Sequence, residues 1–230
     1  MNTPTPELKQ IGDWHVATCW NWDYQSAWDF QKETKERVQL TNEKWLIACS
    51  HPDVLTHGRG LQKAKKGQSF ELTDFNLASF PQLPVPFFQI ERGGGLTFHH
   101  PGQLILYPIV KLHPQRLGLS ALVDNLLLSV KGALEERGLK NLDHSRQLLG
   151  LWHEHQKLAS VGISVDRMVT MHGLALNVSR FDDLKNKLSA LAPCGMGPAT
   201  YTSVEEITGR ACTPGDLLPE VTRRFFHAWE

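Results

Sequence analysis

The stretch Arg92-Gly93-Gly94-Gly95-Leu96-Thr97-Phe98-His99-His100-Pro101-Gly102-Gln103-Leu104 joins two apolar segments of this 230-residue chain. Before it, residues 86–90 predict a strand, and after it residues 104–110 predict another. Consecutive glycines let a backbone approach a ligand closely and expose N–H groups. The stretch lacks the spacing of a dinucleotide loop and contains no phosphate-binding Gly-Lys-Ser/Thr loop. It indicates a small-molecule site of another kind, and the alternative is a β-bulge or tight turn.

Other predicted strands come in sequence-adjacent pairs, with few helices between them. We therefore expect one α+β domain, built on a mixed or antiparallel sheet flanked by helices. The domain should span residues 13–230 and follow a flexible segment over residues 1–12. The expected strands are 14–20, 44–49, 148–152, 157–165 and 169–178; the expected helices span 24–38 and 120–138, with further helix starts at Ser203 and Thr213; a loop is expected over 51–84.

Composition narrows the class of protein. Lys plus Arg equals Asp plus Glu at 24 each, so the charge balance gives no reason to expect nucleic acid or a membrane as partner. The first residues do not resemble a secretory signal, and no apolar run is long enough to span a bilayer. Four widely spaced cysteines disfavour a disulfide framework and a structural zinc site. A cytoplasmic protein is expected.

Cys194 and Lys157 are candidate reactive residues. Cys194 lies in Pro193-Cys194-Gly195, a context that disfavours a helix interior or a central strand and leaves the thiol accessible to a ligand. Lys157 begins an alternating segment, where a lysine is usually a solvated edge residue. An ammonium group near a thiol lowers the thiol pKa, and partial burial lowers the pKa of the lysine. Such a pair can exchange a proton near neutral pH and activate a nucleophile.

The histidines do not predict a metal centre. His153 and His155 alternate across an expected hairpin, and no third ligand at suggestive spacing accompanies them. We interpret them as surface residues and expect no metal.

Five segments, in this order along the chain, resemble the lipoyl(octanoyl) transferase family of the biotin and lipoate protein ligase superfamily. The segments are residues 51–56, residues 92–104, Lys157-Leu158-Ala159-Ser160-Val161-Gly162-Ile163, residues 171–178 and Pro193-Cys194-Gly195. The resemblance covers most of the chain from about residue 50 to about residue 200.

The resemblance implies transfer of an octanoyl group from octanoyl-acyl carrier protein to a lysine of a lipoyl domain. The acceptors would be the lipoyl domains of 2-oxoacid dehydrogenases and the glycine cleavage H protein. Cys194 would carry the acyl group as a thioester and Lys157 would tune the thiol. Because a thioester is already activated, no ATP or other cofactor is expected. Substrate binding would fall to Arg92, Gly93, Gly94, Gly95, Leu96, Thr97, Phe98, His99, Ser160, Val161, Gly162, Gly173, Leu174 and Ala175. Leu176 is a further candidate for the pocket wall.

Two positions depart from the family pattern. His100 stands where the family usually has glycine, which would strain the backbone if the position requires a positive φ. Cys49-Ser50 precedes His51 where the family commonly has an acidic residue.

Alternatives remain open. An ATP-dependent lipoate or biotin protein ligase shares the glycine-rich loop and the lysine but needs no nucleophilic cysteine. A non-catalytic acyl-binding relative, or an enzyme that moves octanoyl between protein lysines, is also compatible with the chain. For the carrier protein, which is acidic, the basic run containing Lys63, Lys65 and Lys66 is the expected docking site.

Overall fold

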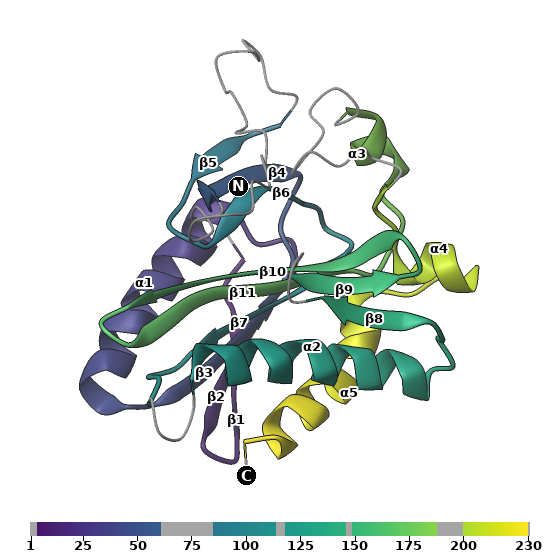
Figure 1. Ribbon diagram of the computed structural model, residues 1–230. Helices are drawn as coiled ribbons and strands as arrows, with labels where there is room; N and C mark the ends of the chain where they lie inside the picture. Colours follow the sequence, from purple (N-terminus) through teal and green to yellow (C-terminus); the bar gives the residue numbers. More distant parts are fainter. Residues whose placement is uncertain (1–3, 61–84, 114–117, 146–148, 188–199, 230) are drawn as a thin grey trace, which may run out of the picture.

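The structure is a computed structural model, and it describes residues 4–60, 85–113, 118–145, 149–187 and 200–229 (Figure 1). Within these ranges the chain forms a large sheet, a small sheet and five helices. The α+β architecture expected from the sequence is confirmed.

The large sheet has eight strands in the order β1-β2-β3-β7-β11-β10-β9-β8. β2 and β3 run parallel, and every other neighbouring pair is antiparallel, so the sheet is mixed. The strands are β1 (Glu7–Ile11), β2 (Trp14–Cys19), β3 (Lys44–Cys49), β7 (Gln103–Ile109), β8 (Leu142–Ser145), β9 (Gly150–His153), β10 (Gln156–Asp166) and β11 (Val169–Asn177).

The two faces of the large sheet are covered by different elements. Helices α2 (Leu119–Glu136) and α5 (Pro214–His227) pack together and enclose the larger hydrophobic core on one face (Figure 1). Helix α1 (Tyr24–Thr41) packs against β3, β7 and β11, and the second apolar cluster lies there. The short helices α3 (Asp182–Lys187) and α4 (Val204–Thr208) follow β11. In the described ranges, no helix is both long and apolar enough to cross a membrane.

The small sheet has the order β5-β4-β6 and stands at one end of α1 (Figure 1). It consists of β4 (Val54–Gly60), β5 (Phe87–Gln89) and β6 (Gly94–His99). β4 is parallel to β5 and antiparallel to β6. Tyr24, at the start of α1, packs with Val54 and Ile90 and so fastens the helix to this sheet.

Local sequence signals explain where the helices begin and end. Asp23 caps α1 by accepting a hydrogen bond from the Ser26 N–H at 2.9 Å, and Ser203 caps α4 through a capping box with Glu206. Gly138 has a φ of 89°, the left-handed conformation expected where α2 stops. Ser120, at the expected start of this helix, is a natural N-cap candidate by residue type, but the N-cap of α2 is Gly118 and Ser120 lies within the helix.

Two expectations about elements need correction, and two elements were not expected. Glu7–Ile11 form the exposed edge strand β1 by pairing with β2, although residues 1–12 were expected to be flexible. Val54–Gly60 form β4, although a loop was expected from residue 51. Strand β8 and helix α3 carry too little apolar periodicity to be predicted. In each case pairing or packing with another segment stabilises an element that its own residues do not favour; the partner is adjacent in the sequence for β1 and β8 and distant for β4.

Candidate active site

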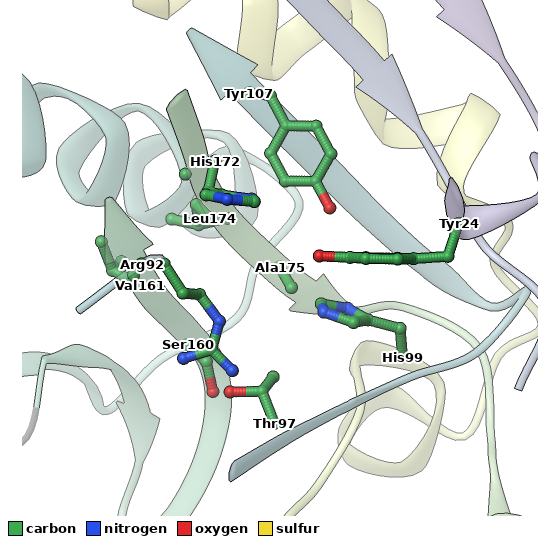
Figure 2. A pocket seen from close by; sticks show the side chains of 12 residues that line it. Tyr24, Arg92, Thr97, His99, Tyr107, Ser160, Val161, His172, Leu174 and Ala175 are labelled. Carbon is green, nitrogen blue, oxygen red and sulfur yellow. The ribbon is translucent and has the colours of Figure 1, made fainter. Parts of the chain in front are cut away.

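A pocket lies where the large sheet, the small sheet and α1 meet (Figure 2). Strands β10 and β11 form one wall, β6 and Arg92 form the opposite side, and α1 and β7 each contribute a tyrosine. The lining residues are Tyr24, Arg92, Thr97, His99, Tyr107, Ser160, Val161, Gly162, His172, Gly173, Leu174 and Ala175.

We call this pocket the slot. Its empty space amounts to about 330 Å³, including the space at its open mouth. Ser160 pairs with Ala175 and Gly162 pairs with Gly173, and all four residues line the slot, so it follows β10 and β11.

Arg92 is buried and held in a fixed position beside the slot. Its Nη2 donates to the carbonyl oxygen and to the hydroxyl of Thr56, at 3.0 and 2.9 Å, and its Nη1 donates to the Gly93 carbonyl at 3.0 Å. These bonds orient the guanidinium toward the slot, as Figure 2 shows. A fixed cationic group at this place suits an oxygen atom of a bound ligand.

The glycine run packs tightly against β10. A Cβ atom at Gly162 would lie 2.8 Å from the Gly93 carbonyl oxygen and 3.0 Å from the Arg92 Cδ. The Gly93 N–H donates to the Ile163 carbonyl at 3.2 Å, so this group is already occupied and does not face a ligand. Close contact between two backbones therefore accounts for Gly162, whereas a Cβ atom at Gly93 would lie 3.6 Å from the Ile163 carbonyl oxygen, an ordinary contact.

A chain of hydrogen bonds leads from the slot toward Lys157. His99 Nδ1 is 2.9 Å from Gln103 Oε1, and Gln103 Nε2 donates to Asn177 Oδ1 at 2.9 Å. Asn177 Nδ2 donates to the Thr202 carbonyl at 3.0 Å, and the Thr202 N–H donates to the Lys157 carbonyl at 3.1 Å. The segment beginning at Tyr201 is thereby fixed beside β10.

Burial keeps the histidines of this region neutral. It lowers the pKa of His51 to about 4 and that of His172 to about 3, and it holds the pKa of His99 well below the ordinary value. Burial also raises the pKa of Tyr24 and of Tyr107. At neutral pH these side chains therefore act as uncharged hydrogen-bonding groups.

The structure brings together most of the residues expected to bind substrate. Arg92, Thr97 and His99 line the slot from one side, and Ser160–Gly162 and Gly173–Ala175 line it from the other. Gly93, Gly94 and Gly95 are not among the lining residues. Leu96 and Phe98 lie on the opposite face of β6, packed in the cluster that contains Phe181 and Tyr201, and Leu176 lies in the core under α2 and α5. The expectation that Phe98 and Leu176 wall the pocket is therefore wrong, because strand alternation turns them away from it.

Lys157 is 8 % exposed and lies on β10, three positions before Ser160. Its Nζ is 5.4 Å from the centre of the Trp152 ring, and a Cβ atom at Gly150 would lie 2.8 Å from its Cε. It is thus a packed side chain and not the solvated edge residue that its local sequence suggests. Cys194 lies outside the described residues. The same holds for the three lysines of the basic run, Lys63, Lys65 and Lys66.

Sequence reasoning missed three lining residues: Tyr24, Tyr107 and His172. His172 lies within a segment that carries the family resemblance, residues 171–178, but no role was assigned to it. Tyr24, Ala27 and Gln31 share one buried face of α1, and two polar residues on an apolar helix face were the available signal. Among the described residues, no three His, Cys, Asp or Glu side chains are grouped as metal ligands.

The departures at His100 and Cys49 are accommodated by packing. His100 does not have a positive φ, so the expected strain is absent. Its ring stacks on Phe181 with centroids 4.6 Å apart, and its Nδ1 accepts a hydrogen bond from the Gly102 N–H at 3.2 Å. Cys49 is fully buried with its Sγ 3.8 Å from His51 Nε2, and burial raises the pKa of its thiol.

The fold is that of the lipoate and biotin protein ligases. Lipoate-protein ligase A bound with ATP aligns with 87 % of this chain and 78 % of its own, at a TM-score of 0.65 and 13 % identity. A bipartite lipoate protein ligase from Thermoplasma acidophilum aligns with 96 % of this chain and 84 % of its own, at a TM-score of 0.69 and 13 % identity. At these identities the likeness concerns the fold alone.

The sequence comparisons specify the family. Residues 23–226 match the lipoyl protein ligase A/B catalytic domain. An octanoyltransferase of Alkaliphilus metalliredigens is 35 % identical over 196 residues, which cover 85 % of each chain. An octanoyltransferase of Corynebacterium diphtheriae is 30 % identical over 198 residues, 83 % of this chain and 72 % of the relative. The chain belongs to the octanoyltransferase family within the lipoate and biotin protein ligase superfamily.

Proposed function

We propose that this chain transfers an octanoyl group from octanoyl-acyl carrier protein to a lysine of a lipoyl domain, through a thioester on Cys194. The observation that carries the proposal is that a buried lysine, Lys157, lies on the same strand that walls the slot. Membership of the octanoyltransferase family supplies the reaction class. The catalytic unit is proposed to extend over residues 13–230.

Cys194 is proposed to lie near Lys157. Tyr201 follows Cys194 by seven positions and forms a β-bridge with Lys157. Seven residues of extended chain span at most about 25 Å, so Cys194 is within reach of the lysine. A thiolate–ammonium pair between Cys194 and Lys157 is the state that begins the reaction.

In the first half-reaction the Cys194 thiolate attacks the thioester carbonyl, and a new carbon–sulfur bond forms. The bond to the carrier's thiol breaks, and the leaving thiolate takes a proton from the Lys157 ammonium. Cys194 then holds the octanoyl group, and Lys157 is a neutral amine. Backbone N–H groups close to Cys194 would stabilise the oxyanion, Gly195 being the candidate.

In the second half-reaction the neutral amine of the acceptor lysine attacks the acyl-enzyme. The amide bond forms, Cys194 leaves as a thiolate, and Lys157 takes the proton that the attacking nitrogen loses. The thiolate–ammonium pair is thereby regenerated. No nucleotide is consumed, because the thioester supplies the free energy.

The slot is proposed to hold the octanoyl chain. Ala175 offers an apolar side chain to the slot, whereas Val161 and Leu174 line it from strands whose side chains there belong to the core under α2 and α5. Ser160 marks the end nearest to Lys157. Burying a methylene group is worth about 0.8 kcal/mol, so seven carbons beyond the carbonyl provide several kcal/mol toward binding.

The test is to incubate the protein with octanoyl-carrier in the absence of ATP and to determine its mass. We expect one octanoyl adduct, located on Cys194 and lost on addition of a lipoyl domain. Cys194→Ser should abolish turnover, whereas Cys212→Ser, a change at a partly exposed free cysteine, should retain it. Transfer only in the presence of ATP would indicate a ligase, and carrier binding without transfer would indicate a non-catalytic relative; either result would contradict the proposal.

A further inference from the structure

His172 has an unusual backbone for a residue inside a strand. Its φ is 60°, although it lies in the middle of β11 and pairs with Ile163. The left-handed conformation costs free energy for a residue with a side chain, and such strain is found where function requires it. Other non-glycine residues with positive φ near this hairpin, Arg167 and Met168, occupy its turn, where the conformation is ordinary.

The left-handed backbone changes the direction of the imidazole. Leu174 and Leu176 face the core under α2 and α5, and Ala175 faces the opposite side. Strict alternation would place His172 with the leucines. Instead its ring lines the slot and lies 6.0 Å from the Tyr107 ring in an edge-to-face arrangement (Figure 2).

Gln31 of α1 holds this conformation. Its Oε1 accepts a hydrogen bond from the His172 N–H at 2.9 Å, and its exposed fraction is 0 %. The bond uses the His172 N–H, which in a regular strand would not be directed toward α1. A buried amide on a helix therefore compensates a strained strand residue 141 positions away in the sequence.

His172 and Tyr107 close one end of the slot, and Ser160 and Thr97 lie at the other (Figure 2). Ile163 pairs with His172 and lies three positions after Ser160 on β10. Three positions of a strand correspond to a distance of about 10 Å along it. An extended chain advances roughly 1.2 Å per bond, as peptide backbone does, so the seven bonds of an octanoyl chain span about 8 Å. The length of the extended chain therefore matches the distance from the Ser160 end of the slot to the imidazole.

The end wall is also polar. His172 Nε2 and the Tyr24 hydroxyl are buried and have no hydrogen-bond partner among the described residues. A longer alkyl chain that pressed into this wall would displace the rings without satisfying either atom.

We propose that His172 sets the acyl-chain length at eight carbons, and that Gln31 is the positioning residue that holds its imidazole across the end of the slot. The inference rests on the proposed function in one respect, namely that the acyl carbonyl lies at the Lys157 end. Chain-length selection is then decided by a backbone conformation and not by the volume of apolar residues.

The test compares octanoyl- with decanoyl-carrier as donors for the wild type, three single variants and one double variant. His172→Gly removes the imidazole and adopts the left-handed backbone without strain. We expect it to lower the ratio of octanoyl to decanoyl kcat/KM at least tenfold. Gln31→Leu should shift the ratio in the same direction, and it should have no further effect in the His172→Gly background. Gln25→Leu, at an exposed position of the same helix, is the matched control and should keep the wild-type ratio.

Binding of free fatty acids of six to twelve carbons, measured as the shift in melting temperature, gives a readout that does not require transfer. A wild-type maximum at eight carbons that moves to longer chains in His172→Gly supports the inference even if no lipoyl domain is modified, a result that would defeat the proposed function alone. An unchanged profile in His172→Gly, or additive effects of the two substitutions, would overturn the inference.

Discussion

Asn177 and Thr202 are joined by a hydrogen bond of 3.0 Å, in which the Asn177 side-chain amide donates to the Thr202 carbonyl. The same asparagine accepts a hydrogen bond from Gln103, whose own oxygen contacts His99 in the slot. One buried side chain thus connects the slot to the segment that lies beside Lys157.

Asn177→Leu should therefore impair both stability and turnover. It leaves the Thr202 carbonyl unpaired in a buried place and removes one of the two acceptors of the Gln103 amide, which keeps its hydrogen bond to the Phe98 carbonyl, at a cost of about 1–3 kcal/mol for each buried group left unpaired. We expect a lower urea midpoint and a fall in kcat of tenfold or more. The matched control is Asn125→Leu, which removes a bond to the Phe225 carbonyl away from the slot and should lower stability but not kcat. Equal kcat values for the two variants would contradict the role given to Asn177.

Gly162→Ala should disturb the contact between β10 and the glycine run. The added methyl group would lie 2.8 Å from the Gly93 carbonyl oxygen, so the Arg92–Gly93 backbone must move away from the slot. Overpacking of this kind costs about 1–3 kcal/mol, and we expect kcat/KM to fall at least tenfold. At Gly118 a Cβ atom meets nothing within 4 Å, so Gly118→Ala is the control for the substitution itself. Thermal unfolding and steady-state kinetics on both variants test the prediction.

Stability should fall with acid because several histidines are buried in the neutral form. Burial lowers the pKa of His51 and His100 to about 4 and that of His172 to about 3, whereas an unfolded chain has a value of about 6.5. Below pH 6.5 the unfolded state therefore binds more protons than the folded state. Their stabilising contribution is complete above this pH and is lost as the pH falls toward 4, at about 1.4 kcal/mol per pH unit for each histidine.

His100→Phe isolates one of these histidines. The new ring retains the stacking on Phe181 but has no titratable group, so the slope of unfolding free energy between pH 6 and pH 4.5 should decrease by about 1.4 kcal/mol per unit. Loss of the Gly102 hydrogen bond affects all pH values alike and leaves the slope unchanged. Denaturant titrations across this range measure it, with His155→Gln at the exposed tip of the β9–β10 hairpin as control. A slope identical to that of the wild type would show that His100 does not contribute.

Charge reversal at Lys63, Lys65 and Lys66 tests the proposed carrier docking site. An acidic carrier protein is attracted to a basic run, so the triple Lys→Glu variant should raise the KM for octanoyl-carrier and weaken its dependence on salt. The value of kcat should change little. The control is a small octanoyl thioester donor that lacks the carrier protein, for which KM should be unaffected. Unchanged kinetics with the carrier would rule out docking at this run.

The helices and strands that could be predicted are those whose sequence pattern lies within a few neighbouring residues. The helix caps at Ser203 and Thr213, the stop at Gly138 and the apolar runs at 44–49 and 104–110 are signals within a few residues, and the structure confirms them. Strand β4 exists because β6, about 40 positions later, pairs with it, and no local pattern predicts that pairing. Strand β1 pairs with β2 across the turn at Gly12, so its signal is local but its exposed residues do not show a strand pattern. The same distinction applies to the slot. Its glycine run and its β10 and β11 segments are readable as motifs, whereas Tyr24, Tyr107 and the orientation of His172 are not.

The amino-acid sequence by itself determined the family, the class of fold and the segments that approach the slot, because these depend on residue types at fixed spacing along the chain. Only the tertiary structure decided which side chains face the slot, how deep it is and what closes it. The physical reason is that a strand's alternation and a helix's face assign directions only relative to neighbours that are distant in sequence. Gln31 and His172 illustrate this most clearly, since one hydrogen bond across 141 positions turns a ring from the core into the slot.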